Sequence, residues 1–345
     1  TGVQTCALPI SALNVNVERQ TSHGTSGTGI AEIDGSLLFI GRNNKDIRAF
    51  SYSFATDSYR ADNMTLLYGH LFVKGNRPLF MTVLKGYDDT NANFLCVVRE
   101  SGDMAVATVD MENSVLGWSR FVTDGKFLDC MVVESLLDGY TVPAPTLYVL
   151  VQRTINGTPR VFLEAMVEGD VYVDCFSRGA GDSNGVQNWG GLGSLAGKTV
   201  QIVGDGTVLS ETTVANDGTF ITSEPVFNSL FVGLPYTSYA ETLALDVKVG
   251  GNSLKGSKIR LVKAIFDFVK TWQFRVNGNE IPFRFFRSEN YDDPLYAFTG
   301  QQEVRIHNNG SSHQASPTVI FEVDQPVGST INSATFTVKL PRNAK

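Results

Sequence analysis

The chain has 345 residues, of which 42% are hydrophobic and 18% charged, a balance typical of a soluble, ordered protein with enough length to bury a core. Its formal net charge of −7 argues against a protein that grips nucleic-acid phosphates. No apolar stretch reaches the roughly 18 residues that a membrane-spanning helix needs, so no membrane span is predicted.

The first ten residues, TGVQTCALPI, are unlike the rest of the chain. They carry no positive charge, and their longest apolar run is Ala7-Leu8-Pro9-Ile10, too short for a signal peptide. All ten match the in-frame translation of a common sequencing-adapter oligonucleotide. We therefore expect residues 1–10 to be an adapter-derived artefact without a role, and the chain to be the C-terminal part of a longer protein.

Turn dipeptides are frequent and evenly spread. Asp-Gly occurs at 34, 124, 138, 205 and 217, and Asn-Gly at 156, 277 and 309. These pairs readily adopt the positive φ angles of tight hairpins, and they separate short runs rich in β-branched and aromatic residues. The pattern predicts an all-β chain.

Residues 11–178 are expected to form propeller-like β blades. Residues 94–134 read as four strands, the size of one blade. The opening hairpin of this segment has counterparts upstream and downstream, which align at Leu38, Leu95 and Leu147 with spacings of 57 and 52 residues. A partial propeller is favoured over an unrelated meander.

Two further β regions are expected downstream. Residues 179–250 are expected to form a small β-module. Its entry is predicted to be a long loop, because residues 177–197 are rich in Gly, Ser and Asn. In the C-terminal β-domain at 251–345, residues 258–278 fit both helical and strand spacing. Their aromatic and β-branched residues favour a long strand, and residues 334–340 alternate as a half-buried strand.

The candidate chemical motifs are better interpreted as structural features than as catalytic or binding sites. GTSGTGI at 24–30 has Ile30 where a phosphate-binding loop needs Lys, so we expect a flexible Gly/Thr turn. The histidines are scattered, and His307 and His313 are expected to form a surface pair. Asp88-Asp89 and Asp292-Asp293 are expected in solvated turns. The other two histidines, His23 and His70, belong to no recognisable cluster. The three cysteines Cys96, Cys130 and Cys175 are expected to be buried, reduced thiols.

No catalytic, cofactor or metal site is predicted, and the chain is not expected to be an enzyme.

Several segments together resemble the nozzle protein of short-tailed bacteriophages, also called tail tubular protein B. They are the aromatic strand and His-Leu of 50–72, the hairpin of 148–166, the G-L-x-x-L-x-G-K module of 191–206 and the GLPYTS segment of 232–246. The residues that match the family pattern are Phe50, Tyr52, Phe54, His70, Asn156, Gly157, Gly197, Lys198, Asp205, Gly206, Gly233, Leu234, Pro235, Tyr236, Thr237 and Ser238. The N-terminal part of the family protein has no counterpart here, and the stretch after Gly278 matches in pattern alone.

The resemblance implies a structural role in the virion tail, in a protein made in the bacterial host cytoplasm. The family assembles as a ring of six identical subunits below an adaptor (gatekeeper) ring, and DNA passes through its lumen without specific binding. The alternative is a carbohydrate-binding or glycan-degrading β-propeller, which would require clustered exposed Trp residues and facing carboxylates. A periplasmic propeller is a third possibility.

Overall fold

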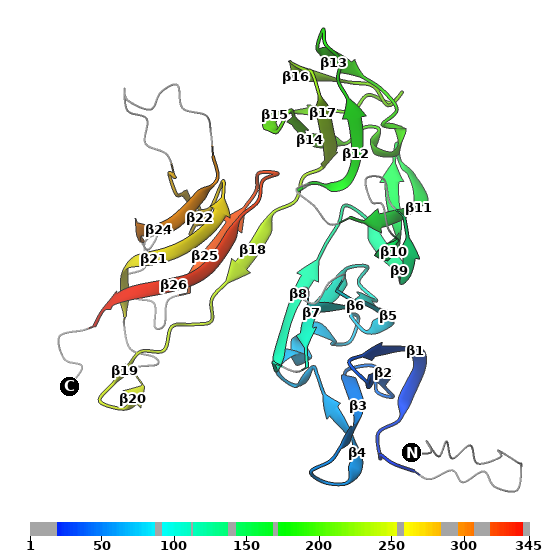
Figure 1. Ribbon diagram of the computed structural model, residues 1–345, viewed down its shortest axis with the longest axis vertical. Helices are drawn as coiled ribbons and strands as arrows, with labels where there is room; N and C mark the ends of the chain where they lie inside the picture. The colour runs from blue at the N-terminus through cyan, green and yellow to red at the C-terminus, as the bar shows by residue number, and fades with distance from the viewer. Residues whose placement is uncertain are drawn as a thin grey trace, which may run out of the picture. The chain divides into compact units, whose positions relative to one another are not determined.

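The computed structural model describes residues 19–86, 92–111, 113–136, 143–167, 172–253, 259–283, 296–306 and 318–340. Most of these residues lie in antiparallel β-strands and very few lie in helices, which confirms the predicted all-β fold (Figure 1). No helix in these ranges is long and apolar enough to cross a membrane. The chain divides into two compact units, Thr1–Thr154 with Pro159–Val167, and Ile155–Thr158 with Glu168–Lys345.

The first unit contains three consecutive antiparallel meanders. The first sheet comprises β1 (Thr25–Ile33), β2 (Ser36–Gly41), β3 (Ile47–Ser53) and β4 (Ser58–Asn63), and is followed by the 3-10 turn η1 (Leu66–Leu71). The second comprises β5 (Pro78–Leu84), β6 (Asn93–Arg99), β7 (Met104–Asp110) and β8 (Val115–Phe121). The third comprises β9 (Lys126–Ser135), β10 (Ala144–Ile155) and β11 (Thr158–Met166).

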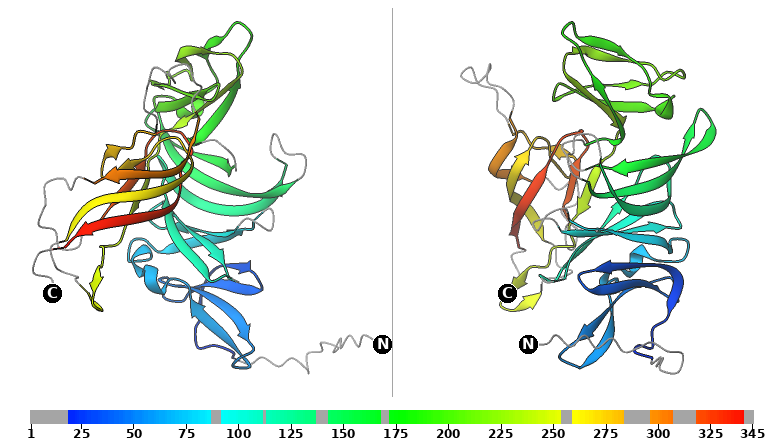
Figure 2. Two further views of the ribbon diagram at one scale, coloured as in Figure 1. Left: turned by 60° about the vertical axis from the view of Figure 1, so that its left-hand side comes forward. Right: turned by 45° about the vertical axis from the view of Figure 1, so that its right-hand side comes forward.

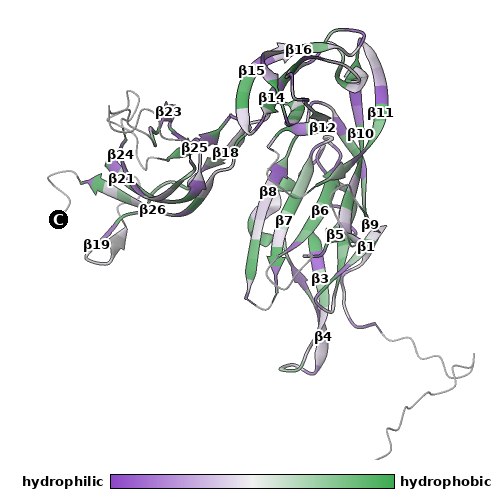
Figure 3. Cartoon of the chain, turned by 45° about the horizontal axis from the view of Figure 1, so that its top comes forward, coloured by the Kyte–Doolittle hydropathy of each residue, from purple (hydrophilic) through white to green (hydrophobic). Residues whose placement is uncertain are grey.

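These three sheets stack face to face, and the central strands β6 and β7 of the middle sheet are buried on both faces (Figure 2). Leu95 and Val97 of β6 pack in one cluster with Leu38 of the first sheet. Cys96 and Val98 pack in a second cluster with residues of β9 and β10. A strand that is covered on both faces has no solvent-facing side, which explains the continuous apolar runs of β6 and β7 (Figure 3).

The repeat seen in the sequence has a structural counterpart. Leu38, Leu95 and Leu147 each lie on the second strand of their sheet, and all three are fully buried. Each repeat therefore begins one strand earlier than the sequence indicated. The closure of these sheets into a propeller stays a prediction.

The second unit contains a small module and a separate pair of sheets. The module is built from β12 (Asp174–Ala180), β13 (Val186–Trp189), the 3-10 turn η2 (Gly193–Leu195), β14 (Thr199–Gly204), β15 (Thr207–Thr213), β16 (Phe220–Val226) and β17 (Ser229–Leu234). The C-terminal sheets contain β18 (Ser238–Glu241), β21 (Arg260–Thr271), β22 (Arg275–Val276), β23 (Asn279–Glu280), β24 (Phe298–Arg305), β25 (Ile320–Val323) and β26 (Thr330–Lys339), and β19 (Lys248–Val249) pairs with β20 (Asn252–Ser253).

The prediction of one blade at residues 94–134 is wrong, because β9 leaves that sheet. Cys130 of β9 pairs with Val149 of β10, and β5 supplies the fourth strand beside β6. Arg153 of β10 donates hydrogen bonds to the Thr123 hydroxyl at 2.6 Å and to the Asp124 carbonyl at 2.8 Å. These contacts hold the start of β9 against β10, and they come from a residue about thirty positions later.

The predicted Gly/Thr turn at 24–30 is also wrong, because residues 25–30 belong to β1. Ile30 pairs with Phe39 of β2, and the register shifts between Thr25 and Ile30. Gly27 and Gly29 lie within this register shift and have φ angles of 85° and 40°. Positive φ at a glycine is typical of a β-bulge.

The predicted loop at 177–197 and both domain boundaries need correction. β12 continues to Ala180, and β13 also lies within the supposed loop. The boundary expected at 178/179 therefore falls inside β12, which pairs with β17 of the module. The boundary expected at 250/251 falls between β19 and β20, whereas β18 already pairs with β25 of the C-terminal sheets. Spacing within one strand does not reveal which distant strand it pairs with.

The ambiguous segment at 258–278 is a strand, as predicted, but it is shorter than expected. β21 ends at Thr271, after Lys270 with a φ of 46° interrupts the extended backbone. Phe266 and Phe268 are fully buried within an aromatic core, as their strand spacing required. The half-buried strand expected at 334–340 is confirmed as β26, which ends at Lys339.

Candidate functional site

A cleft of about 470 Å³ lies beside the loop that joins β2 to β3 in the first unit. Its charged lining comprises three arginines, one histidine and one carboxylate: Arg19, Arg42, Arg48, His23 and Asp46. The remaining lining residues are small or polar: Thr21, Ser22, Gly24 and Asn43. The cleft is therefore locally basic on a chain whose net charge is negative.

The loop at 41–46 folds back on itself and places the carboxylate. The Gly41 amide donates to the Asp46 carbonyl at 2.8 Å, and the Asn44 amide donates to the Gly41 carbonyl at 2.8 Å. Asn44 has a φ of 52°, which asparagine tolerates better than most residues. A Cβ at Gly41 would lie 2.2 Å from Asp46 Oδ1, so the glycine leaves the space that this carboxylate occupies.

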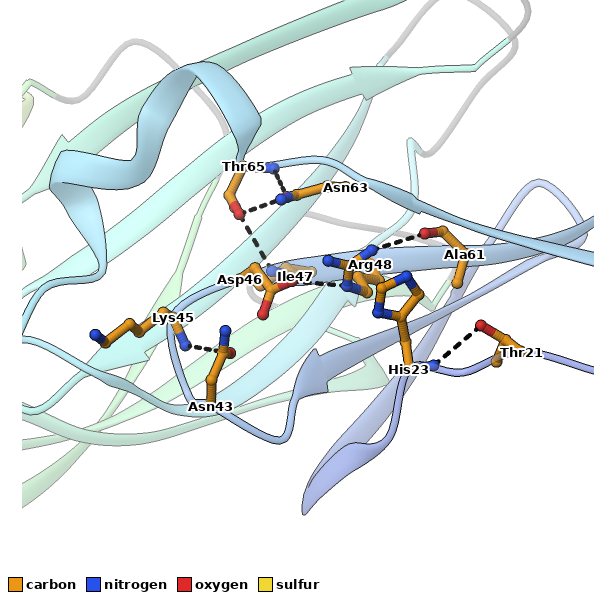
Figure 4. A network of polar contacts seen from close by, with 10 residues as sticks. All are labelled: Thr21, His23, Asn43, Lys45, Asp46, Ile47, Arg48, Ala61, Asn63 and Thr65. Atoms are coloured by element: carbon orange, nitrogen blue, oxygen red, sulfur yellow. Dashed lines mark hydrogen bonds and ion pairs between the residues drawn. The ribbon is translucent and has the colours of Figure 1, made fainter.

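Asp46 and Arg48 form a mostly buried ion pair on the wall of the cleft (Figure 4). Arg48 Nε donates to Asp46 Oδ2 at 2.7 Å, and Arg48 Nη1 donates to the Ala61 carbonyl at 3.0 Å. The Ile47 amide between them donates to the Thr65 hydroxyl at 3.3 Å. The pair is therefore held by both β3 and β4, and it neutralises the carboxylate of the cleft.

Arg19 and Arg42 are held mainly by backbone. Arg19 Nε and Nη2 donate to the carbonyls of Thr21 and Ser22 at 3.0 and 3.1 Å. The Arg42 amide donates to the Gly24 carbonyl at 2.8 Å, and the Arg42 guanidinium lies so close that a Cβ at Gly24 would be 3.0 Å from Nη2. Neither guanidinium is paired with a carboxylate in the described part of the chain.

This arrangement suits the binding of an anion. Guanidinium groups donate hydrogen bonds and accept none, and two parallel N–H groups match the oxygens of phosphate or carboxylate. Within the described ranges, no three His, Cys, Asp or Glu side chains gather as a metal site. Asp88-Asp89, Asp292-Asp293, His307 and His313 lie outside the described residues. His23 lines the cleft and His70 is exposed in η1.

Three of the residues that match the nozzle pattern lie in an aromatic cluster on the β3–β4 hairpin. Phe50 stacks on Tyr59 with ring centres 5.0 Å apart and an interplanar angle of 5°. Tyr52 makes edge contacts with Tyr59 and with Phe54, which is 91% exposed in the turn. The Tyr52 hydroxyl donates to Asp57, and this bond raises the pKa of Tyr52.

Most of the other matching residues have structural roles. Asn156-Gly157 and Asp205-Gly206 have positive φ at both positions and close the β10–β11 and β14–β15 hairpins. Gly197 has a φ of 77° in the turn before β14, and Lys198 follows it. Asn156 lies beside Gly197, where a Cβ would be 3.2 Å from Asn156 Oδ1, whereas Asp205-Gly206 closes a different hairpin.

The GLPYTS segment joins the module to the C-terminal sheets. Gly233 and Leu234 end β17, Ser238 begins β18, and Pro235, Tyr236 and Thr237 connect them. A Cβ at Gly233 would lie 2.5 Å from the Asp174 carbonyl oxygen, so glycine permits β12 to approach β17 closely. Burial raises the pKa of Tyr236, which lies near Tyr172 and Asp174.

Two apolar surfaces at the ends of the three-sheet stack were not anticipated. The outer aromatic face is the side of the first sheet opposite its core, where Ile30, Leu37, Tyr52 and Tyr59 are exposed beside half-buried Phe39 and Phe50. The outer aliphatic face is the corresponding side of the third sheet, where the exposed residues are Met131, Val133, Leu150, Val161 and Leu163. In β3 the aromatic residues Phe50 and Tyr52 alternate with Ser51 and Ser53 in the sequence, but alternation does not tell whether another sheet covers the aromatic side.

The assignment of the outer aliphatic face follows from strand alternation. Cys130 and Val149 face the middle sheet and lie in its core cluster. Met131 and Leu150 are their sequence neighbours and therefore point the other way. On β11, Glu164 bonds Arg153 on the inner side, which places its neighbour Leu163 on the outer side.

No protein-family model matches the chain, and no curated protein matches it.

Proposed function

We propose that this chain is a structural virion protein that forms the distal tail nozzle ring of a short-tailed bacteriophage, a conduit for genome ejection. The observation that carries the proposal is the pair of apolar surfaces at the two ends of the sheet stack. Large contiguous apolar surfaces commonly mark contacts with other proteins. The sequence segments that resemble the nozzle family are the reason for proposing a tail nozzle as the assembly.

The two end faces favour assembly with other copies of the chain. The outer face of the first sheet is rich in aromatic residues, whereas that of the third is aliphatic. A contact between one face and the other in a neighbouring copy would be heterologous, and heterologous contacts close into rings when the rotation between subunits allows it. From the resemblance to the nozzle family, we propose that the ring contains six subunits and contacts an adaptor ring.

The charge of the chain suits a passage for DNA. Each Lys or Arg contact with phosphate adds salt-dependent affinity that would slow a moving duplex. A formal net charge of −7 reduces such retention, so DNA would pass without specific binding. We place the assembled protein in the virion tail after synthesis in the host cytoplasm.

The alternative proposal is a carbohydrate-binding or glycan-degrading β-propeller. The observation that favours it is the exposed ring cluster of Tyr52, Phe54 and Tyr59, because aromatic faces are common linings of ligand sites. Glycan-array binding that is lost in Phe54→Ala, from a chain that stays monomeric, would favour this function over the nozzle.

The nozzle proposal is tested by self-assembly. We expect the chain to form closed rings in analytical ultracentrifugation and negative-stain images. Leu37→Glu on the first sheet and Leu163→Glu on the third should each weaken assembly, because each places a charge within a buried apolar contact. A mixture of Leu37→Lys and Leu163→Glu chains should assemble better than either chain alone, since the charges then face each other.

Leu243→Glu is the matched control, because Leu243 is 91% exposed and lies on neither end face. Circular dichroism must show that all variants remain folded. A chain that is monomeric at every concentration, or assembly that survives both end-face charges, would contradict the proposal.

A further inference from the structure

We propose that the arginine-lined cleft beside the β2–β3 loop binds a phosphate group. This inference is independent of the nozzle assignment. The cleft borders the outer aromatic face, because Arg48 of β3 pairs with Phe39 of β2 on that side of the sheet. The site is built from Arg19, Arg42 and Arg48, with His23 on the same lining.

The balance of charge in the cleft favours an anion. Three guanidinium groups and one carboxylate line it, and the carboxylate of Asp46 already accepts from Arg48. The Asp46–Arg48 pair is mostly buried and is fixed by the bond from Arg48 to the Ala61 carbonyl. Two positive charges, those of Arg19 and Arg42, therefore remain without a carboxylate in the described ranges.

Arg42 supplies the donors that the fold leaves unused. Its guanidinium has only hydrogen-bond donors, and no acceptor among the described residues binds them. Its backbone amide donates to the Gly24 carbonyl. A Cβ at Gly24 would lie 3.0 Å from Arg42 Nη2, so the guanidinium lies beside Gly24 in the space that a side chain there would take. A restrained fork of N–H groups loses little freedom when it binds two oxygens of a phosphate.

Arg19 provides the second donor group. Two of its nitrogens donate to the carbonyls of Thr21 and Ser22, which fix the direction of the side chain. Nη1 is the nitrogen that these two bonds leave for a ligand. The Thr21 hydroxyl accepts from the His23 amide at 3.2 Å, so the segment 21–23 is folded locally beside the cleft.

The volume fits more than a bare ion. About 470 Å³ lies within the range of roughly 300–1,000 Å³ that small-molecule sites occupy. The phosphate could belong to a free phosphate compound or to a nucleic-acid strand. The shared requirement is a tetrahedral oxyanion that takes two N–H donors from one arginine.

The test is direct binding to the intact chain. Isothermal titration calorimetry would use inorganic phosphate, pyrophosphate and a short single-stranded DNA as three separate probes. We expect pyrophosphate to bind, and Arg42→Gln to weaken that binding by at least about tenfold, because hydrogen bonds to charged groups are among the strongest in proteins. Binding should also weaken as salt is raised.

Arg60→Gln is the matched control, since Arg60 is an exposed arginine on the same sheet that pairs with Asp62. Binding of the phosphate probes with loss of affinity only in Arg42→Gln supports the site. Tighter binding of DNA than of pyrophosphate would identify the strand as the source, and the reverse would identify a free compound. No binding of any probe, or equal weakening by both substitutions, would overturn the proposal, whatever the assembly state of the chain.

Discussion

Asp205, in the turn between β14 and β15, accepts a hydrogen bond of 2.7 Å from the backbone amide of Phe227, in the turn between β16 and β17. The same carboxylate also accepts from the amides of Asn228 at 2.8 Å and Ser229 at 2.9 Å. One side chain therefore ties together two turns of the module that are more than twenty residues apart in sequence. These amide bonds hold the pKa of Asp205 below its usual value.

The first prediction concerns acid stability of the module. Because the pKa of Asp205 is lowered in the folded state, its contribution is fully present above the unfolded-state pKa and is lost as pH falls through the folded-state pKa. Asp205→Asn should therefore lower the melting temperature at neutral pH and flatten its dependence on pH in the acidic range. Thermal melts between neutral and acidic pH measure this. Asp182→Asn is the control, and an equal effect of both substitutions would refute the proposed clamp.

The second prediction concerns the buried Arg153 of β10. Its Nε and Nη2 donate to the two carboxylate oxygens of Glu164 at 2.9 and 2.8 Å. Glu164→Ala leaves a guanidinium that is 1% exposed without this carboxylate, and we expect a loss of roughly 3 kcal/mol in unfolding free energy.

Glu303→Ala is the control for this pair, because Glu303 pairs with Lys263 on the surface and should cost about 0–1 kcal/mol. Urea denaturation measures both variants. Similar losses of unfolding free energy in the two variants would show that the buried Arg153–Glu164 pair contributes no more to stability than a surface pair.

The third prediction concerns the close approach of β12 to β17. Gly233→Ala would place a Cβ 2.5 Å from the Asp174 carbonyl, so the strands must separate, at a cost of roughly 1–3 kcal/mol. Gly117→Ala is the control in a strand with open space around the Cβ position. Urea unfolding curves compare the two, and a neutral Gly233→Ala would contradict the close contact.

The fourth prediction concerns the two thiols in the core between the middle and third sheets. Burial raises the pKa of Cys96 and of Cys130 to about 12. Both should therefore be unreactive toward a thiol reagent at about pH 8 while the protein is folded, since the thiolate is the reactive form. A chain carrying Cys6→Ser and Cys175→Ser isolates them for a colorimetric assay.

Denaturant should expose both thiols at once. The raised pKa also means that the stability due to these neutral thiols is fully present below the unfolded-state pKa and declines as pH rises toward the folded-state value. Rapid labelling of the folded chain at near-neutral pH would show that this core opens more readily than its packing implies.

The local features of the fold were predictable from sequence. Asp34-Gly35, Asn156-Gly157, Asp205-Gly206 and Asn277-Gly278 have positive φ at both positions and close hairpins, as these dipeptides predict. Asp124-Gly125 and Asp217-Gly218 have positive φ only at the glycine. The pairs at 138 and 309 lie outside the described residues. Turn chemistry is a property of two or three adjacent residues, so it can be read without knowing the rest of the chain.

Strand partners were not predictable in the same way. The run from Lys126 to Glu134 was recognised as a strand, but its pairing with β10 was not, and Arg153 of β10 binds Thr123 and Asp124 from a distant position in the sequence. The arginine cleft likewise brings Arg19, Arg42 and Arg48 together without a motif that links them.

The sequence by itself determined the all-β class, the hairpin turns and the buried leucines that repeat along the first unit. The tertiary structure decided which strands share a sheet, which apolar faces remain uncovered and which arginines meet. The physical reason is range: backbone preference and side-chain alternation act between neighbours, whereas sheet pairing, face-to-face packing and charge clustering depend on residues that are far apart until the chain folds.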